Sequence, residues 1–274
     1  MTHWKNIDYS KIDLPEINNV VFYPRHDPVC TLDNQFVKSI MIPIGDGEVI
    51  STIWSEKENM RGSILFFHGN GEIASDYLDI AHIFLQMDIR FVCADYRGYG
   101  HSSGTPTITS MIEDAHEIFK CIHDRLSDNH EPLIVMGRSL GAASALELAA
   151  TYSDKIDGLI IESGFAETMS LLRTLGADPS YLQINERDGF ANSDKISNFF
   201  KPLLIIHAEE DFLIPIEQAE KLYAAAGSSH KEILRIPAAG HNDIFFTGTE
   251  NYLKYVKELI DVSIKMKSMK ISNS

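Results

Sequence analysis

The sequence predicts an α/β protein built on a doubly wound, mostly parallel sheet. Three observations support this fold class. Short apolar runs bounded by turn residues recur along the chain, several are continuously apolar as strands buried on both faces are, and longer segments with helical spacing of apolar residues separate them. This alternation of strand and helix is typical of a sheet covered by helices on both faces.

The expected elements follow in chain order. Two strands at 36–42 and 48–54, joined by the turn Gly45-Asp46-Gly47, are predicted to form a hairpin. Six more strands are predicted at 63–67, 89–94, 132–136, 156–161, 203–207 and 232–236. Helices are predicted at 75–87, 109–127, 139–152, 215–226 and 249–262.

The predicted domain covers residues 36–262, with an N-terminal extension at 1–35 and a C-terminal tail at 263–274. The outermost residues, 1–15 and 265–274, are expected to be loosely held. One connection, from Ile161 to Leu203, spans about 40 residues and exceeds what an αβ connection needs. We therefore predict a short helical cap insertion at about 164–201. An ordinary helix followed by a long loop is the alternative.

The composition indicates a soluble protein that folds by itself. The chain has 274 residues, of which 44% are apolar and 23% are charged. Lys and Arg number 24 against 39 Asp and Glu, which gives a net charge of -15. Because the averaged field repels phosphate backbones and anionic lipids, general nucleic-acid binding is disfavoured.

Cysteine usage and hydropathy predict a cytoplasmic protein. Cys30, Cys93 and Cys121 are too few for a disulfide framework and lack the paired spacing of a zinc site, so no metal is expected. The first residues lack the apolar stretch of a signal peptide, and no apolar run is long enough to span a bilayer. We expect no integral membrane association, and the oligomeric state stays open.

The pattern Gly-x-Ser-x-Gly occurs at 100–104 and at 137–141, and context distinguishes the two copies. A nucleophile elbow is a tight turn from a strand into a helix with small neighbours. Only the second copy follows an apolar strand and leads into an alanine-rich helix. Ser139 is therefore the predicted nucleophile, at a helix N-terminus that favours negative charge. Ser102 and Ser103 are interpreted as structural.

A serine nucleophile needs a base, and the base needs an acid that orients it. On this type of scaffold the chain order is serine, acid, histidine. His241, in a glycine-containing turn after the last strand, is the predicted base, since His207 lies in a strand and His230 in a polar loop. Asp211, where the seventh strand turns into a helix, is the predicted acid. The alternative acids are Glu210 and Glu162.

Acyl transfer also needs amide donors for the oxyanion, each worth roughly 3 to 4 kcal/mol in worked enzyme cases. The elbow supplies the amide of Leu140. The loop after the third strand, His68-Gly69-Asn70-Gly71, has a glycine-flanked, flexible backbone. The amide of Asn70 is the predicted second donor of the oxyanion hole.

Together these motifs resemble the single-domain serine hydrolases of the α/β-hydrolase superfamily, in particular the branch that includes mammalian protein depalmitoylases and their bacterial relatives. The resemblance covers about residues 36–262 and rests on the loop at 68–71, the segment 95–100, the elbow at 137–141, the turn from Asp211 to Pro215, and Gly240-His241. It implies an eight-stranded sheet with an antiparallel second strand, hydrolysis of a small ester or thioester through an acyl-enzyme on Ser139, and no cofactor.

In such a fold the cap lies above the carboxyl ends of the strands, on the side where ligands bind. Its apolar side chains are predicted to wall a pocket for a short or medium acyl chain. Alternatively, they only pack the cap onto the body. The candidate substrate-binding residues are Phe165, Met169, Leu172, Tyr181 and Phe190.

Three other functions compete with ester hydrolysis. A phosphate-binding loop at Gly98-x-Gly100 lacks its third glycine, because position 103 is Ser103, and no helix opens there. A serine peptidase or amidase would use the same residues on the same fold. A non-catalytic interaction protein would be expected to lack a triad residue, and all three have candidates here.

Overall fold

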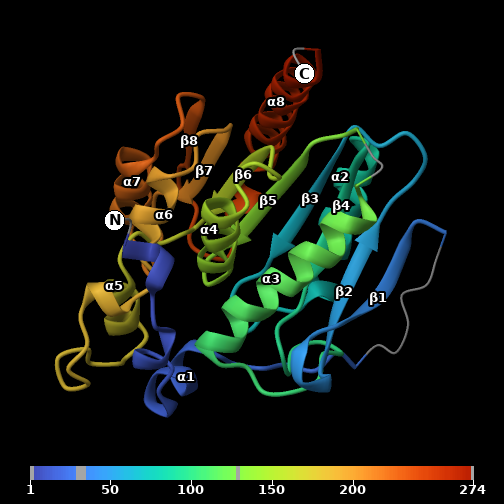
Figure 1. The fold of residues 1–274 in the computed structure, drawn as a ribbon. Coiled ribbons are helices and arrows are strands. Elements are labelled where there is room, and N and C mark those ends of the chain that lie inside the picture. Colours follow the sequence, from blue (N-terminus) through green and yellow to red (C-terminus); the bar gives the residue numbers. More distant parts are fainter. Residues whose placement is uncertain (1–2, 29–34, 128–129, 273–274) are drawn as a thin grey trace.

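An eight-stranded sheet runs through the centre of the molecule, and helices cover both of its faces (Figure 1). The computed structural model describes residues 3–28, 35–127 and 130–272. The strands lie in the order β1-β2-β4-β3-β5-β6-β7-β8. Their bounds are β1 Val37–Pro43, β2 Val49–Ser55, β3 Gly62–Phe67, β4 Ile89–Ala94, β5 Leu133–Arg138, β6 Gly158–Glu162, β7 Leu203–Ala208 and β8 Lys231–Ile236.

The pairing of the strands confirms the predicted fold class. β2 is antiparallel to β1 and β4, and every other neighbouring pair is parallel. The first and the last residue of each predicted strand lie within two residues of the bounds of the corresponding observed strand. The prediction succeeds because the central strands β3 to β7 are buried along their whole length, and such strands are continuously apolar.

The α-helices divide between two core clusters, one on each face of the sheet. α3, α4 and α7 pack on one face together with the short helices α5 and α6, and α2 and α8 pack on the other. The α-helices are α1 Pro15–Val21, α2 Leu78–Gln86, α3 Ile108–Arg125, α4 Gly141–Thr151, α5 Thr168–Thr174, α6 Asn192–Ser197, α7 Ile216–Ala225 and α8 Ile244–Ser272. Single 3₁₀ turns cover His3–Asn6, Tyr9–Lys11, Gly45–Gly47, Ala74–Tyr77 and Glu186–Asp188.

The last helix is longer than predicted. α8 extends to Ser272, whereas the sequence predicted a helix over 249–262 and a loosely held tail. Lys267 explains part of the difference, because its ammonium donates to the carbonyl of Glu131 and to Asp157, each at 2.9 Å. The prediction of a tail from 263 is therefore wrong for residues 263–272. The polar residues of this segment do not indicate in the sequence that Lys267 bonds to distant parts of the chain.

The N-terminal segment is also better held than predicted. Ile12 and Ile17 are fully buried in the cluster that contains α3 and α4. The segment packs against α3 and against the two cap helices α5 and α6. The expectation of a loose N-terminus is wrong for the described residues from 3 to 15, because their apolar side chains complete the core.

A buried ionic group joins this N-terminal segment to the cap. Lys195 on α6 is 0% exposed, and its ammonium lies 2.7 Å from Glu147 Oε2 and 2.8 Å from the hydroxyl of Tyr9. His116 Nε2 lies 3.5 Å from the other oxygen of Glu147. Burial opposes ionisation of Glu147, but hydrogen bonding and attraction from His116 and Lys195 outweigh it and lower the pKa of Glu147 to about 2.

Glu147→Gln is expected to destabilise the fold, because it leaves the buried ammonium of Lys195 without a counter-ion. Removing one partner of a buried pair costs about 3–5 kcal/mol. The folded-state pKa of Glu147 lies below its unfolded value, so the carboxylate contributes stability above about pH 4.3 that is lost as the pH falls toward 2. Urea unfolding should therefore give a difference between wild type and Glu147→Gln that is large at neutral pH and smaller near pH 3.

Glu117→Gln provides a matched control for this prediction. Glu117 pairs with Lys120 at 2.8 Å on the exposed side of α3. Exposed pairs of this kind contribute about 0–1 kcal/mol. Equal effects of the two substitutions on the free energy of unfolding would contradict the account of the buried group.

Candidate active site

The turn after β5 holds Ser139 in a left-handed backbone conformation. Its φ of 53° is uncommon for a residue with a side chain and typical of a strained strand-to-helix turn. The flanking glycines are required by close packing. A Cβ on Gly137 would lie 2.3 Å from the carbonyl oxygen of Gly141, and a Cβ on Gly141 would lie 2.1 Å from that of Phe67. The turn is thereby pressed against the end of β3.

Ser139, His241 and Asp211 form a continuous chain of hydrogen bonds. Ser139 Oγ lies 3.0 Å from His241 Nε2, and His241 Nδ1 lies 2.7 Å from Asp211 Oδ2. The three residues come from the turn after β5, the loop after β8 and the loop after β7. The structure thus brings together the residues that the sequence predicted as nucleophile, base and acid.

Asp211 is held by backbone amides as well as by the imidazole. Its Oδ1 accepts hydrogen bonds from the amides of Leu213 at 3.0 Å and Ile214 at 2.8 Å. Burial acts to raise the pKa of Asp211, but the hydrogen bond and charge of His241 and the amide of Ile214 outweigh it and hold this pKa below its usual value. The ionised carboxylate favours a proton on Nδ1 of His241, which leaves Nε2 able to accept one from Ser139.

The loop after β3 carries the predicted oxyanion donor Asn70. The side chain of Asn70 fixes this loop, because its Oδ1 accepts hydrogen bonds from the amide of Tyr23 and the hydroxyl of Tyr99, both at 2.8 Å. Within the described part of the chain, the amides of Asn70 and Leu140 donate to no other protein group. Both amides are therefore free to donate to a bound oxygen.

The other Gly-x-Ser-x-Gly copy supports the backbone of β2. Ser102 Oγ accepts a hydrogen bond from the amide of Ser51, and Ser103 Oγ accepts one from the amide of Val49, both at 2.9 Å. Ser102 is buried. These contacts are structural, as the sequence context indicated.

The alternative acids and bases have other hydrogen-bond partners or are exposed. The carboxylate of Glu162 bonds to a neighbouring arginine and tyrosine, and Glu210 is exposed. His207 is buried beside the acid, with its Nε2 at 3.6 Å from Asp211 Oδ2, and bonds to a backbone carbonyl. His230 is exposed and directly precedes β8.

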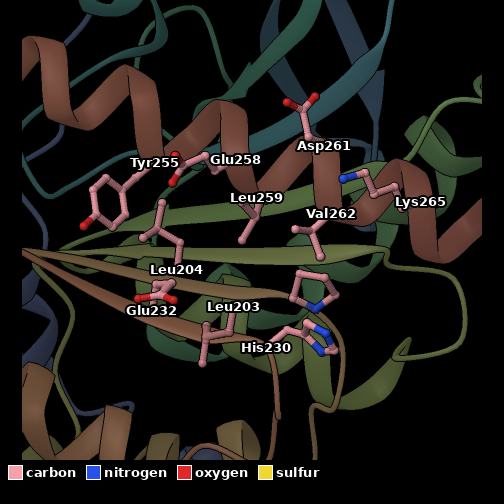
Figure 2. Close-up of a pocket in the computed structure, with 11 residues that line it drawn as sticks. Leu203, Leu204, His230, Glu232, Tyr255, Glu258, Leu259, Asp261, Val262 and Lys265 are labelled. Carbon is pink, nitrogen blue, oxygen red and sulfur yellow. The ribbon is translucent and has the colours of Figure 1, made fainter.

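A cavity of about 420 Å³ lies at the other end of the sheet (Figure 2). Its walls come from the starts of β7 and β8 and from α8, and include Leu203, His230, Tyr255 and Leu259. Ser139 follows the carboxyl end of β5, so this cavity is separate from the candidate active site.

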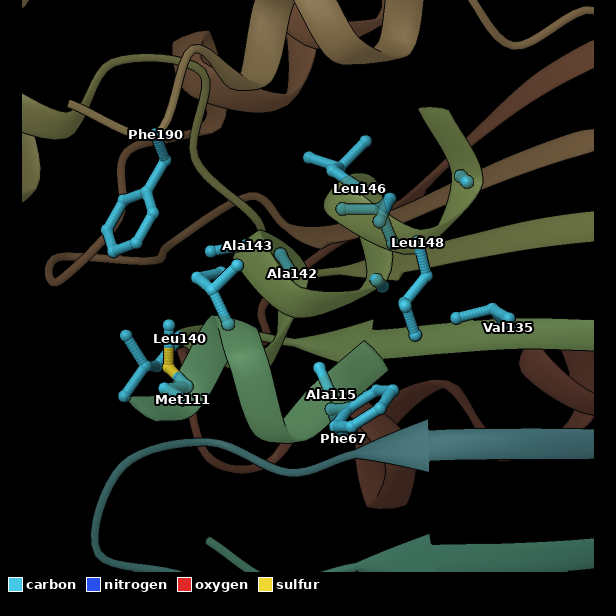
Figure 3. Close-up of a cluster of buried hydrophobic side chains, with 14 of the residues drawn as sticks. Phe67, Met111, Ala115, Val135, Leu140, Ala142, Ala143, Leu146, Leu148 and Phe190 are labelled. Carbon is cyan, nitrogen blue, oxygen red and sulfur yellow. The ribbon is translucent and has the colours of Figure 1, made fainter. Parts of the chain in front are cut away.

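Four predicted substrate-binding residues are buried in the cap. They are at most 5% exposed and belong to the same core cluster as Leu140. Figure 3 shows one of them, Phe190, beyond the N-terminal end of α4, on the same side as Leu140 and Met111. The four residues are Phe165, Met169, Leu172 and Phe190.

Tyr181 differs from the other four. It lies in the loop between α5 and α6 and is 82% exposed. The prediction that it walls an enclosed pocket is wrong, because successive turns in this loop leave its ring in solvent. In a segment with several glycines and prolines, the sequence does not distinguish an exposed aromatic residue from a buried one.

Sequence reasoning missed three residues beside the site. Arg138, Glu72 and Tyr252 form a largely buried hydrogen-bonded group with Glu162, and Arg138 also donates to the histidine loop. A signal existed for Arg138 alone. It is a charged residue at the end of a continuously apolar strand, inside the elbow motif itself.

Three further properties of the described residues concern metal ions, thiols and the membrane. In the ranges 3–28, 35–127 and 130–272, no group of His, Cys, Asp and Glu side chains is arranged to hold a metal ion. Cys93 and Cys121 have free thiols, and Cys30 lies outside the described residues. No helix in these ranges combines the length and the apolar character that crossing a bilayer requires.

Known proteins resemble this chain in sequence. A family model described as serine aminopeptidase, S33, matches residues 58–176. Human alpha/beta hydrolase domain-containing protein 17B is 30% identical over 206 residues, which cover 74% of this chain and 67% of that protein. Protein bem46 of Schizosaccharomyces pombe is 28% identical over 192 residues, which cover 69% of this chain and 64% of that protein.

Solved structures resemble it in fold. The esterase Pf2001 of Pyrococcus furiosus superimposes with a TM-score of 0.68 at 18% identity, over 86% of this chain and 98% of that one. Likeness at this identity shows the fold alone. The human relative adds a sequence match across most of both chains. The chain therefore belongs to the α/β-hydrolase family.

Proposed function

We propose that this protein is a serine hydrolase that cleaves carboxylic esters or thioesters through an acyl-enzyme on Ser139. The observation that carries the proposal is the hydrogen-bonded chain from Ser139 through His241 to Asp211, at 3.0 and 2.7 Å, starting from a serine in a left-handed turn. This arrangement supplies a nucleophile, a base and an orienting acid within contact of each other.

The proposed reaction has two halves. His241 Nε2 accepts the hydroxyl proton of Ser139 while Oγ attacks the substrate carbonyl carbon, and the amides of Asn70 and Leu140 donate to the resulting oxyanion. The tetrahedral species collapses, the alcohol or thiol departs with the proton from His241, and the acyl group stays on Oγ. Water then attacks the acyl-enzyme with His241 again as base, and the carboxylic acid is released.

A fluorophosphonate probe tests this proposal. The probe phosphonylates only activated serines, so the wild-type protein should become labelled, with the modified peptide containing Ser139. Hydrolysis of p-nitrophenyl esters and acyl thioesters should be lost in proportion to the labelling. Absence of both labelling and hydrolysis would contradict the proposal.

Amide hydrolysis is a second candidate, favoured by the description of the matching family model as serine aminopeptidase. The same residues would serve, with an amine as the leaving group in place of an alcohol or thiol. Aminoacyl p-nitroanilides belong in the same substrate panel. A kcat/KM for these amides above that for the esters would favour the second candidate.

The buried cap residues are proposed to wall the acyl site. Each methylene that the pocket buries should raise kcat/KM roughly fourfold, from about 0.8 kcal/mol, until the pocket is full. We expect an optimum at short to medium chains when esters from acetyl to palmitoyl are compared. Phe190→Ala and Leu172→Ala should shift that optimum.

The control for this prediction is Phe84→Ala, which empties a similar volume in the core cluster on the other face of the sheet. Each truncation costs stability, about 2–5 kcal/mol for a buried leucine or phenylalanine, so all variants are compared well below their melting temperatures. A chain-length profile that is flat, or that shifts equally in Phe84→Ala, would remove the cap from substrate selection.

A further inference from the structure

A buried arginine next to the nucleophile contacts the loop that carries the base. Arg138 is the last residue of β5 and is 6% exposed. Its Nη2 donates to the backbone carbonyl of His241 at 2.7 Å and to Asn242 Oδ1 at 3.2 Å. One side chain thus connects the turn of Ser139 with the histidine loop.

Two carboxylates occupy the remaining sides of this guanidinium. Nε donates to Glu162 at 3.0 Å, and Nη1 donates to Glu72. Glu162 also accepts the hydroxyl of Tyr252 at 2.5 Å. Glu72 accepts the amide of Gly69 and the hydroxyl of Tyr77, both at 2.6 Å.

The second of these carboxylates extends the connection to the oxyanion loop. Gly69 directly precedes Asn70, whose amide is the proposed oxyanion donor. A guanidinium is planar, and its donors keep a rigid fork geometry. Since Nε, Nη1 and Nη2 all have partners, this one rigid group ties together the nucleophile turn, the oxyanion loop and the histidine loop.

We propose that Arg138 is a positioning residue of the hydrolytic site, which sets the approach of the His241 imidazole to Ser139 by holding the carbonyl of His241. This inference rests on the proposed function. Arg138 contacts no reacting atom and acts through the two loops that it joins. A misplacement of about 1 Å costs about 10²-fold in rate, so weakening this support should be visible in kcat.

The fold contains a matched arginine that separates positioning from general stability. Arg90 on β4 is 7% exposed and also lies between two carboxylates. It donates to Glu56 at 3.1 Å, to Ser63 at 2.7 Å and to Glu131. It lies near the start of β4, at the end of the sheet away from Ser139.

The test compares Arg138→Lys with Arg90→Lys by kcat, KM, rate of fluorophosphonate labelling and melting temperature. Lysine keeps the charge but loses the fork. We expect Arg138→Lys to lower kcat and the labelling rate together by about 10–100-fold with little change in KM. Arg90→Lys should lose a similar amount of thermal stability and keep its kcat. Equal effects of the two variants on kcat would overturn the inference.

Tyr252→Phe keeps the test decisive if Arg138→Lys does not fold. This substitution removes the hydroxyl that donates to Glu162 and leaves the aromatic ring in place. We expect a smaller fall in kcat, about 2–10-fold, from the loss of one hydrogen bond to a charged group. An unchanged kcat in Tyr252→Phe together with an unfolded Arg138→Lys would assign the arginine to folding only and overturn the inference.

Chemical rescue tests whether the guanidinium group itself, and not ionic strength, restores the rate. Arg138 lines a cavity of about 290 Å³ between α2 and the start of α8, so Arg138→Ala opens space next to it. Added methylguanidinium should restore part of the kcat of Arg138→Ala, and sodium chloride at the same concentration should not. Rescue by both salts would contradict the inference. A wild-type protein that neither hydrolyses esters nor becomes labelled would instead overturn the proposed function.

Discussion

Ser139→Ala is expected to abolish ester hydrolysis and fluorophosphonate labelling while the protein stays folded. The hydroxyl at 3.0 Å from His241 Nε2 is the proposed nucleophile, and removing such a serine lowers kcat by about 10⁶-fold in serine proteases. Alanine is no more strained than serine at a φ of 53°, so the backbone turn should persist. Steady-state hydrolysis of p-nitrophenyl acetate and in-gel fluorescence measure the loss, and circular dichroism checks the fold.

Ser102→Ala is the matched control, since Ser102 is buried in the other copy of the same motif. It should keep most of the activity. Its cost is to stability, because the amide of Ser51 loses its acceptor, and an unsatisfied buried donor costs about 1–3 kcal/mol. Comparable losses of kcat in both variants, or a loss in Ser102→Ala alone, would show that the nucleophile was misassigned.

Asp211→Asn is expected to lower kcat by about 10⁴-fold with the fold intact. The carboxylate accepts hydrogen bonds on both oxygens, from two backbone amides on Oδ1 and from His241 on Oδ2. An asparagine has one accepting oxygen, so its NH₂ group must face either the amides or His241. If it faces His241, the imidazole carries its proton on Nε2 and accepts none from Ser139. Steady-state hydrolysis of p-nitrophenyl acetate measures the loss, and circular dichroism checks the fold.

Glu210→Gln provides the control for the acid, because Glu210 is adjacent in sequence and exposed. It should behave as the wild type does. Glu162→Gln should have an intermediate effect, since Glu162 bonds to Arg138 and not to His241. A nearly silent Asp211→Asn, combined with a large loss in Glu162→Gln or Glu210→Gln, would move the acid to that residue.

The two ends of the chain illustrate where sequence patterns were insufficient. Ile12 stands between the charged residues Lys11 and Asp13, yet it is fully buried. The sequence around Lys267 predicts a side chain exposed to solvent, but this lysine bonds to Glu131 and Asp157 and helps to extend α8. Ile12 is buried by a core that contains α3 and α4, and the partners of Lys267 lie 136 and 110 positions away, so a window along the chain contains neither set of contacts.

The sequence by itself determined the strand order along the chain and the Ser139 turn. Strands buried on both faces must be apolar throughout. The turn must carry glycine at 137 and 141, because neither position has room for a Cβ. Both features therefore depend on the local sequence. Only the tertiary structure decided which apolar cap residues are buried and which partners Arg138 has. Those partners lie 24, 66 and 103 positions away, and closing such loops depends on the whole sheet rather than on neighbouring residues.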